Sequence, residues 1–148
     1  MLAYQSAIDY LHLDHGARRF RGAKESVGPV ELVALERVMP SAVATLAERL
    51  GVPEADVVKV SGMAPRTWHT RKAGKAALSQ READGVLRIA RIAAEAVRVF
   101  GGEEKAKRWL TVPQALLGGR APFALLDSDA GVQAVEEALG RIHWGDYA

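Results

Sequence analysis

The chain of 148 residues contains no cysteine. Without thiolates it cannot form a disulfide framework, a cysteine-ligated zinc site or an iron–sulfur cluster, and it lacks a cysteine nucleophile. It has no apolar run of about 18 residues, the length that would suggest a membrane span. Its first residues also lack the positive region and apolar core of a secretory signal. These absences predict a cytoplasmic protein with no membrane partner.

Acidic and basic residues are unevenly distributed, although the formal net charge is only +2. Residues 64–91 contain seven basic and two acidic residues, a balance of +5. Residues 121–148 contain one basic and five acidic residues, a balance of −4. This asymmetry indicates two partners of opposite electrostatic character, and an unevenly charged, solvated surface is the alternative.

Helical spacing of apolar residues and helix-capping patterns predict an all-α protein. Residues 1–29 are interpreted as a partly ordered arm, residues 30–78 as a helix-turn-helix bundle, and residues 79–148 as a central helix and a small helical C-terminal domain. The predicted helices span residues 30–39, 41–50 with Ser41 as N-cap, 53–61, 65–72, 79–100, 103–110, 113–117 and about 129–142. A capping box at Ser79–Glu82 precedes the long helix, whose broad apolar face indicates a central helix or a dimer interface.

Two registers of a helix-turn-helix are possible among the four short helices before residue 75. In the first, residues 53–61 form the recognition helix and would present Glu54 and Asp56 to a polyanion. In the second, residues 53–60 support a recognition helix over residues 65–72, which carries cationic and hydroxyl side chains. The second register is favoured because DNA would repel the carboxylates of the first.

In the second register Trp68 is the one large apolar side chain of the recognition helix, so we expect it to face the core. Side chains beside or opposite it are predicted to contact base edges: Arg66, Thr67, His69 and Thr70. Side chains on the buried flank or beyond it are predicted to contact phosphates: Arg71, Lys72 and Lys75. A solvated basic face is the alternative.

No pattern of residues predicts catalysis, and we expect no catalytic, metal or cofactor site. His12 and His15, with Asp9 and Asp14, could hold a metal on a helix, but an exposed polar N-terminus is the simpler interpretation. The glycine pairs at residues 101–102 and 118–119 lack the strand context of a phosphate-binding loop.

An ordered series of short motifs runs through most of the chain. It comprises Arg66-Thr67-Trp68-His69-Thr70-Arg71, Leu78-Ser79-Gln80-Arg81-Glu82, Leu87-Arg88-Ile89-Ala90-Arg91, Trp109-Leu110, Pro113, Leu117-Gly118-Gly119-Arg120, Pro122, Leu125-Leu126, Gly131, Val135, Leu139-Gly140-Arg141-Ile142 and Gly145. In this order the motifs resemble antitoxins of the Xre/MbcA/ParS type, which join an Xre-like helix-turn-helix to a C-terminal toxin-binding domain. Gln114 departs from the pattern, which has asparagine after the proline.

The resemblance implies two partners. Antitoxins of this type are encoded with RES-type toxins, which consume or use NAD; they cover the toxin's active site and repress their own operon by binding operator DNA. A homodimer would match the two-fold symmetry of such an operator. The alternative function is a simple helix-turn-helix transcription regulator whose C-terminal helices only dimerise.

The end of the chain is the predicted toxin-binding segment: Arg141, His143, Trp144, Gly145, Asp146 and Tyr147. We expect the two aromatic residues to provide rigid contacts, Gly145 to allow a turn between them, and Arg141 to pair with a toxin carboxylate. The acidic C-terminal residues would complement the positive cleft that an NAD-using toxin needs. The alternative is a frayed tail with Trp144 folded back on Leu139 and Ile142.

Overall fold

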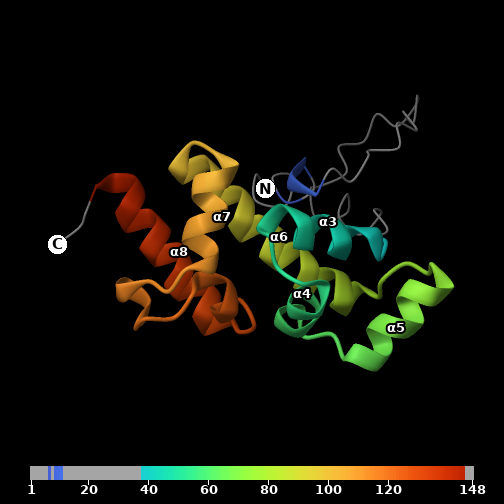
Figure 1. The fold of residues 1–148 in the computed structure, drawn as a ribbon. Coiled ribbons are helices and arrows are strands. Elements are labelled where there is room, and N and C mark those ends of the chain that lie inside the picture. The colour runs from blue at the N-terminus through green and yellow to red at the C-terminus, as the bar shows by residue number, and fades with distance from the viewer. Residues whose placement is uncertain (1–6, 8, 12–37, 146–148) are drawn as a thin grey trace, which may run out of the picture.

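The computed structural model describes residue 7, residues 9–11 and residues 38–145, and over these ranges the protein is all-α (Figure 1), as predicted. The elements are α3 (Ser41–Leu50), α4 (Glu54–Ser61), α5 (Pro65–Gly74), α6 (Gln80–Phe100), α7 (Glu103–Thr111), the 3₁₀ turns η1 (Ala115–Leu117) and η2 (Pro122–Leu125), and α8 (Asp129–Trp144). None of the helices in the described part of the chain is long and apolar enough to cross a membrane.

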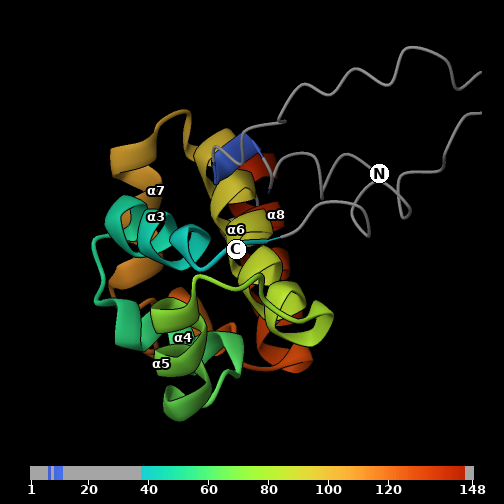
Figure 2. The same cartoon turned by 90° about the vertical axis from the view of Figure 1, so that its right-hand side faces the viewer.

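The long helix α6 is the element on which both halves of the molecule pack. Helices α3 and α4 lie along one part of it and α7 and α8 along the other, while α5 extends from the α3–α4 side (Figures 1 and 2). Val86, Ile89 and Ile92 of α6 are fully buried. The broad apolar face predicted from the sequence therefore belongs to a central helix, which is one of the two interpretations it allowed.

Side-chain caps and glycines determine where the longest helices begin and end. The Ser79 hydroxyl accepts a hydrogen bond from the Glu82 N–H, and the Glu82 carboxylate accepts one from the Ser79 N–H at 2.9 Å, so the predicted capping box forms. Ser128 caps α8 by accepting a hydrogen bond from the Gly131 N–H. Gly101 ends α6 with a left-handed φ of 71°.

The predicted N-cap of α3 is wrong, although the helix spans the predicted residues 41–50. Pro40 occupies the N-cap position with helical backbone angles, so Ser41 is the first helical residue and its side chain makes no cap. Val38 and Met39, predicted as the end of a preceding helix, are not helical. The rest of that predicted helix, residues 30–37, lies outside the described residues.

Two predicted boundaries in the C-terminal half also differ. Residues 113–117 do not form an α-helix, because Gln114 has an extended backbone and its N–H donates to the Arg120 carbonyl at 3.1 Å. That pairing leaves room for only the short turn η1. The last helix continues past Ile142 to Trp144, where Gly145 ends it with a φ of 71°.

The described residues of the predicted N-terminal arm pack on the core. Ala7, Tyr10 and Leu11 are buried in the main hydrophobic cluster. The Arg49 guanidinium of α3 lies 4.1 Å from the centre of the Tyr10 ring and donates a hydrogen bond to the Tyr10 carbonyl. The remainder of residues 1–29 lies outside the described ranges.

Gly85 is required where α6 crosses the end of α4. A Cβ atom added to Gly85 would lie 2.1 Å from the Ser61 carbonyl oxygen, which is backbone and cannot rotate away. We therefore expect Gly85→Ala to lower the free energy of unfolding by about 1–3 kcal/mol, because the helices must separate. Thermal or urea unfolding would measure the change.

Gly140 of α8 is the matched control. A Cβ atom there would meet nothing within 4 Å, so Gly140→Ala should raise the free energy of unfolding by about 0.5–1 kcal/mol through helix propensity alone. A gain of similar size for Gly85→Ala would contradict the close packing of α4 on α6.

Candidate functional site

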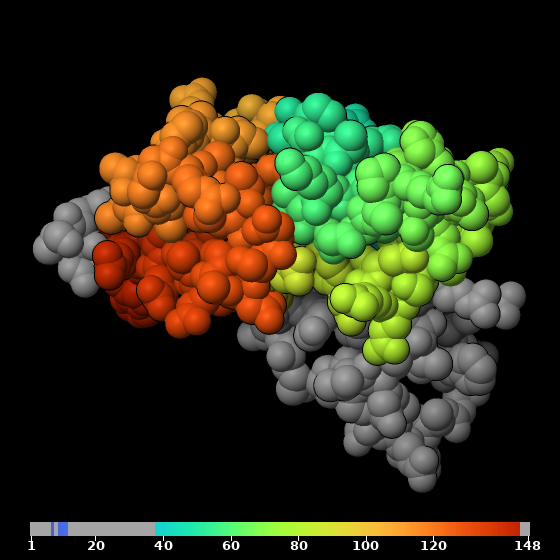
Figure 3. All heavy atoms as spheres, turned by 90° about the horizontal axis from the view of Figure 1, so that it is seen from below, coloured from blue at the N-terminus to red at the C-terminus, as the bar shows by residue number. Residues whose placement is uncertain are grey.

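Helix α5 presents a polar, mainly exposed surface at one end of the molecule. Trp68 is its one buried residue, as predicted, whereas Arg66, His69 and Thr70 are exposed and Thr67 is half-buried. Figures 1 and 3 place α5 at the opposite end of the molecule from the C-terminal end of α8. The predicted base-contacting side chains therefore share one accessible surface, far from the predicted toxin-binding end.

Helix α4 has the character of a supporting helix. It buries Val57, Val58 and Val60 and packs against α3 and α6, which leaves one side of the helix exposed. Its first turn carries Glu54 and Asp56. Both observations favour the second helix-turn-helix register, in which α4 supports and α5 recognises.

Two of the predicted phosphate-binding residues have partners within the chain. The Arg71 guanidinium donates from Nε to one oxygen of Glu82 at 3.1 Å and from Nη2 to the other at 3.3 Å. The Lys72 ammonium donates to a Glu54 carboxylate oxygen at 2.9 Å. Lys75, by contrast, is exposed just beyond α5, with a positive φ of 47°. The sequence reasoning missed both pairs, because each joins residues on different helices.

The carboxylate of Glu82 has two structural roles. It closes the capping box of α6 and holds Arg71 of α5 in a two-point ion pair. Burial by itself would raise the pKa of the Glu82 carboxyl, but the Ser79 backbone N–H and the Arg71 guanidinium together hold that pKa below its ordinary value. The ionised carboxylate therefore fixes α5 against the start of α6.

The described residues of the predicted toxin-binding segment lie in the last turn of α8 and at its C-cap. Arg141, His143 and Trp144 are exposed, and the Trp144 side chain is 82% exposed. The ring centres of His143 and Trp144 lie 5.0 Å apart in an edge-to-face arrangement. Trp144 is therefore not folded onto the core, which is the alternative that the sequence left open. Asp146 and Tyr147 lie outside the described residues.

Two exposed apolar side chains, one of them beside α8, were not predicted. Val112 and Leu116 are 46% and 54% exposed. Leu116 and Arg141 also line a hollow of about 110 Å³ between η1 and α8. Two adjacent leucines in a segment with few charges are a weak signal of an exposed apolar side chain. The sequence does not indicate which of the two leucines is exposed.

No cluster of three or more histidine, aspartate or glutamate side chains that could hold a metal occurs among the described residues. His12 and His15, the histidines considered for such a site, lie outside those residues.

The lowered pKa of the Glu82 carboxyl predicts how the stability of the fold depends on pH. Because the folded state lowers the Glu82 pKa, the ionised carboxylate contributes stability that is present at neutral pH and lost as the pH falls through that lowered pKa. Glu82→Gln keeps a capping side chain but loses the charge paired with Arg71. We expect it to be less stable than the parent at pH 7, with the difference closing in acid.

Urea unfolding of the parent and of Glu82→Gln between pH 7 and pH 3 would measure this difference in stability. Glu104→Gln, at an exposed carboxylate in the first turn of α7, is the control and should differ from the parent much less at pH 7. A constant difference between Glu82→Gln and the parent at all pH values would show that the ion pair with Arg71 does not stabilise the fold.

Comparison with known proteins agrees with this architecture. The family model of the antitoxin Xre-like helix-turn-helix domain matches residues 30–91, and the model of the antitoxin Xre/MbcA/ParS C-terminal toxin-binding domain matches residues 95–145. The boundary between the two models falls inside α6, which both domains share.

Curated relatives and one solved structure support the same grouping. "Antitoxin Xre" of Yersinia enterocolitica is 29% identical over 66% of this chain and 66% of its own length, and "Antitoxin Xre" of Pseudomonas putida is 39% identical over 54% and 50%. The aligned part of the chain thus covers two thirds or less of the length of each of these relatives. A chain of the M. tuberculosis MbcT–MbcA toxin–antitoxin complex has the same fold, with a TM-score of 0.53 and 24% identity over 74% of this chain and 96% of that one. The two family models together cover most of the sequence, and the protein belongs to the Xre/MbcA/ParS family of antitoxins.

Proposed function

We propose that the protein is the antitoxin of a toxin–antitoxin pair, which neutralises a RES-type, NAD-consuming toxin by covering its active site and represses its own operon by binding DNA. The observation that carries this proposal is the match of residues 95–145 to a toxin-binding domain directly after a helix-turn-helix domain. That match also favours an antitoxin over a simple transcription regulator, because a regulator needs no toxin-binding domain.

Co-expression with the product of the adjacent gene tests the proposal directly. We expect that product to stop growth when expressed alone, the present chain to restore growth, and the two proteins to purify together. Normal growth with the neighbouring product alone, or a failure to co-purify, would contradict the antitoxin function.

We infer that operator DNA binds across α5. The exposed guanidinium, imidazole and hydroxyl groups of Arg66, His69 and Thr70 suit base edges in the major groove, and Lys75 suits a phosphate. Arg71 and Lys72 could reach phosphates only by sharing or leaving their carboxylate partners. The protein would bind as a homodimer if the operator is two-fold symmetric, since each recognition helix reads one half-site.

Arg66→Ala tests the recognition surface. If Arg66 makes a bidentate base contact, the variant should lose about 1–3 kcal/mol of operator-binding free energy and discriminate less at one base pair. Lys75→Ala should instead weaken binding to all sequences about equally. Titration of labelled operator and unrelated DNA measures both effects. Loss of binding with Lys59→Ala, but not with Arg66→Ala, would support the first register, with α4 as the recognition helix.

We infer that the toxin contacts the last turn of α8. Trp144 is a large, rigid and almost fully exposed aromatic side chain, the type most often found at the energetic centre of an interface. Arg141 lies one turn earlier on the same helix and is exposed, so it is available to a toxin carboxylate. The exposed Leu116 beside it would extend the contact.

Trp144→Ala tests this contact. We expect it to lose at least about 2 kcal/mol of toxin-binding free energy, the value that defines an interface hot spot, and to fail to restore growth. Gln133→Ala, at an exposed position near the start of α8, is the control and should behave as the parent. A chain truncated after Leu139 should still bind DNA but not neutralise the toxin. Full rescue by that truncation would move the contact to residues 109–122.

A further inference from the structure

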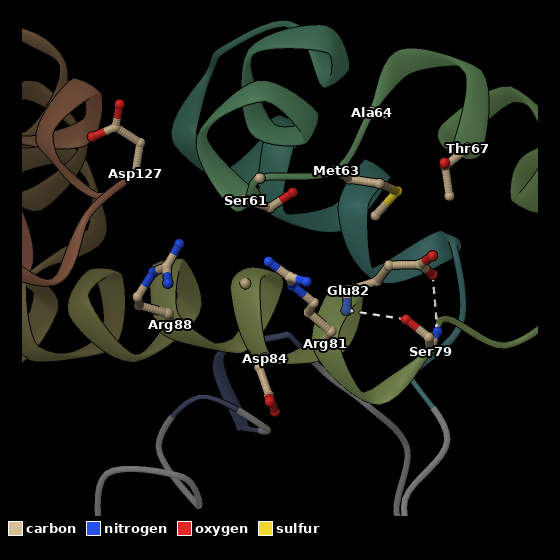
Figure 4. A pocket seen from close by; sticks show the side chains of 12 residues that line it. Ser61, Met63, Ala64, Thr67, Ser79, Arg81, Glu82, Asp84, Arg88 and Asp127 are labelled. Carbon is tan, nitrogen blue, oxygen red and sulfur yellow. Dashed lines mark hydrogen bonds between the residues drawn. The ribbon is translucent and has the colours of Figure 1, made fainter.

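A groove of about 510 Å³ lies beside α5 and was not part of the predicted DNA-binding surface. Its walls are the end of α4 at Ser61, the linker at Met63 and Thr67 of α5, and its floor is the first half of α6 (Figure 4). Asp127, in the loop before α8, closes the far end. The groove therefore begins at the recognition helix and runs along α6 toward the C-terminal domain.

Two guanidinium groups project from α6 into this groove. Arg81 and Arg88 are seven residues apart, which places them on one face of the helix about 10 Å apart along its axis. Arg81 points toward Ser61, and Arg88 lies nearer the end of the groove at Asp127 (Figure 4). Arg81 is exposed and has no ion-pair partner among the described residues. Arg88 is half-buried, and its Nε donates to the Leu126 carbonyl at 3.1 Å, which holds the side chain in place.

The carboxylates near the groove do not cancel this charge at its floor. Glu82 is already paired with Arg71. Asp84 also lines the groove, but its carboxylate points to the side of α6 opposite Ser61 (Figure 4). Asp127 stands at the far end, away from Thr67 and Arg81 (Figure 4). The end of the groove nearest α5 therefore presents free positive charge.

We propose that the end of this groove nearest α5 holds the sugar–phosphate backbone of the DNA beside the recognition helix, with Arg81 contacting a phosphate. This inference rests on the proposed DNA-binding function of α5. Thr67 belongs both to α5 and to the groove wall, so a duplex whose base edges face Arg66 and Thr67 carries a phosphate strand past the adjoining groove. Such contacts position the protein on DNA without reading sequence, because every nucleotide carries the same phosphate.

The salt dependence of DNA binding tests the contact, because each neutralised phosphate releases counterions. For Arg81→Gln we expect the plot of log K against log salt concentration to be less steep by about 0.9, the value for one phosphate. Affinity should fall by the same factor for operator and for unrelated DNA. Arg81→Lys, which keeps the charge, should retain the slope of the parent. Arg98→Gln, at an exposed arginine near the other end of α6, is the matched control and should also retain it.

The outcomes separate this inference from the function on which it rests. If the parent protein does not bind DNA, the proposed DNA-binding function fails. If the parent binds but Arg81→Gln keeps its slope and affinity, the groove proposal alone is overturned. Loss of toxin binding with unchanged DNA binding would also overturn it and would make the groove a protein-binding surface. A lower melting temperature of Arg81→Gln, with affinity lost equally in Arg81→Lys, would overturn it in favour of a structural role.

Discussion

Burial of the apolar surface of α6 is the constraint on which the rest of the structure depends. Residues such as Ile89 and Ile92 are fully buried because the helix-turn-helix elements cover one part of α6 and α7 and α8 cover the other. The two family domains thus share one helix and one hydrophobic cluster.

Polar contacts across α6 then set the positions of the flanking helices. The Glu82 carboxylate fixes α5 through Arg71, and the Arg88 guanidinium binds the Leu126 carbonyl before α8. Arg91 forms a further ion pair with Glu136 of α8. Because all three side chains belong to α6, these contacts fix the positions of both α5 and α8 relative to that one helix.

The arrangement places the two proposed binding surfaces at opposite ends of the molecule (Figures 1 and 3). The two proposed surfaces therefore do not overlap. The charges follow the same division: the basic residues 64–91 include α5 and the first half of α6, and the acidic residues 121–148 include α8. The charge asymmetry visible in the sequence thus corresponds to a separation in space.

The sequence by itself determined the longest helix, because its signals are local: the capping box at Ser79, the glycine that ends α6, and the apolar spacing along α6 all act within a few residues. It also favoured α5 over α4 as the recognition helix through charge alone. Only the tertiary structure decided that Arg71 is paired with Glu82, that Trp144 is exposed on a helical turn, and that Arg81 shares a groove with Thr67. These features depend on how helices cross, and crossing angles arise from the packing of many side chains that a local pattern does not encode.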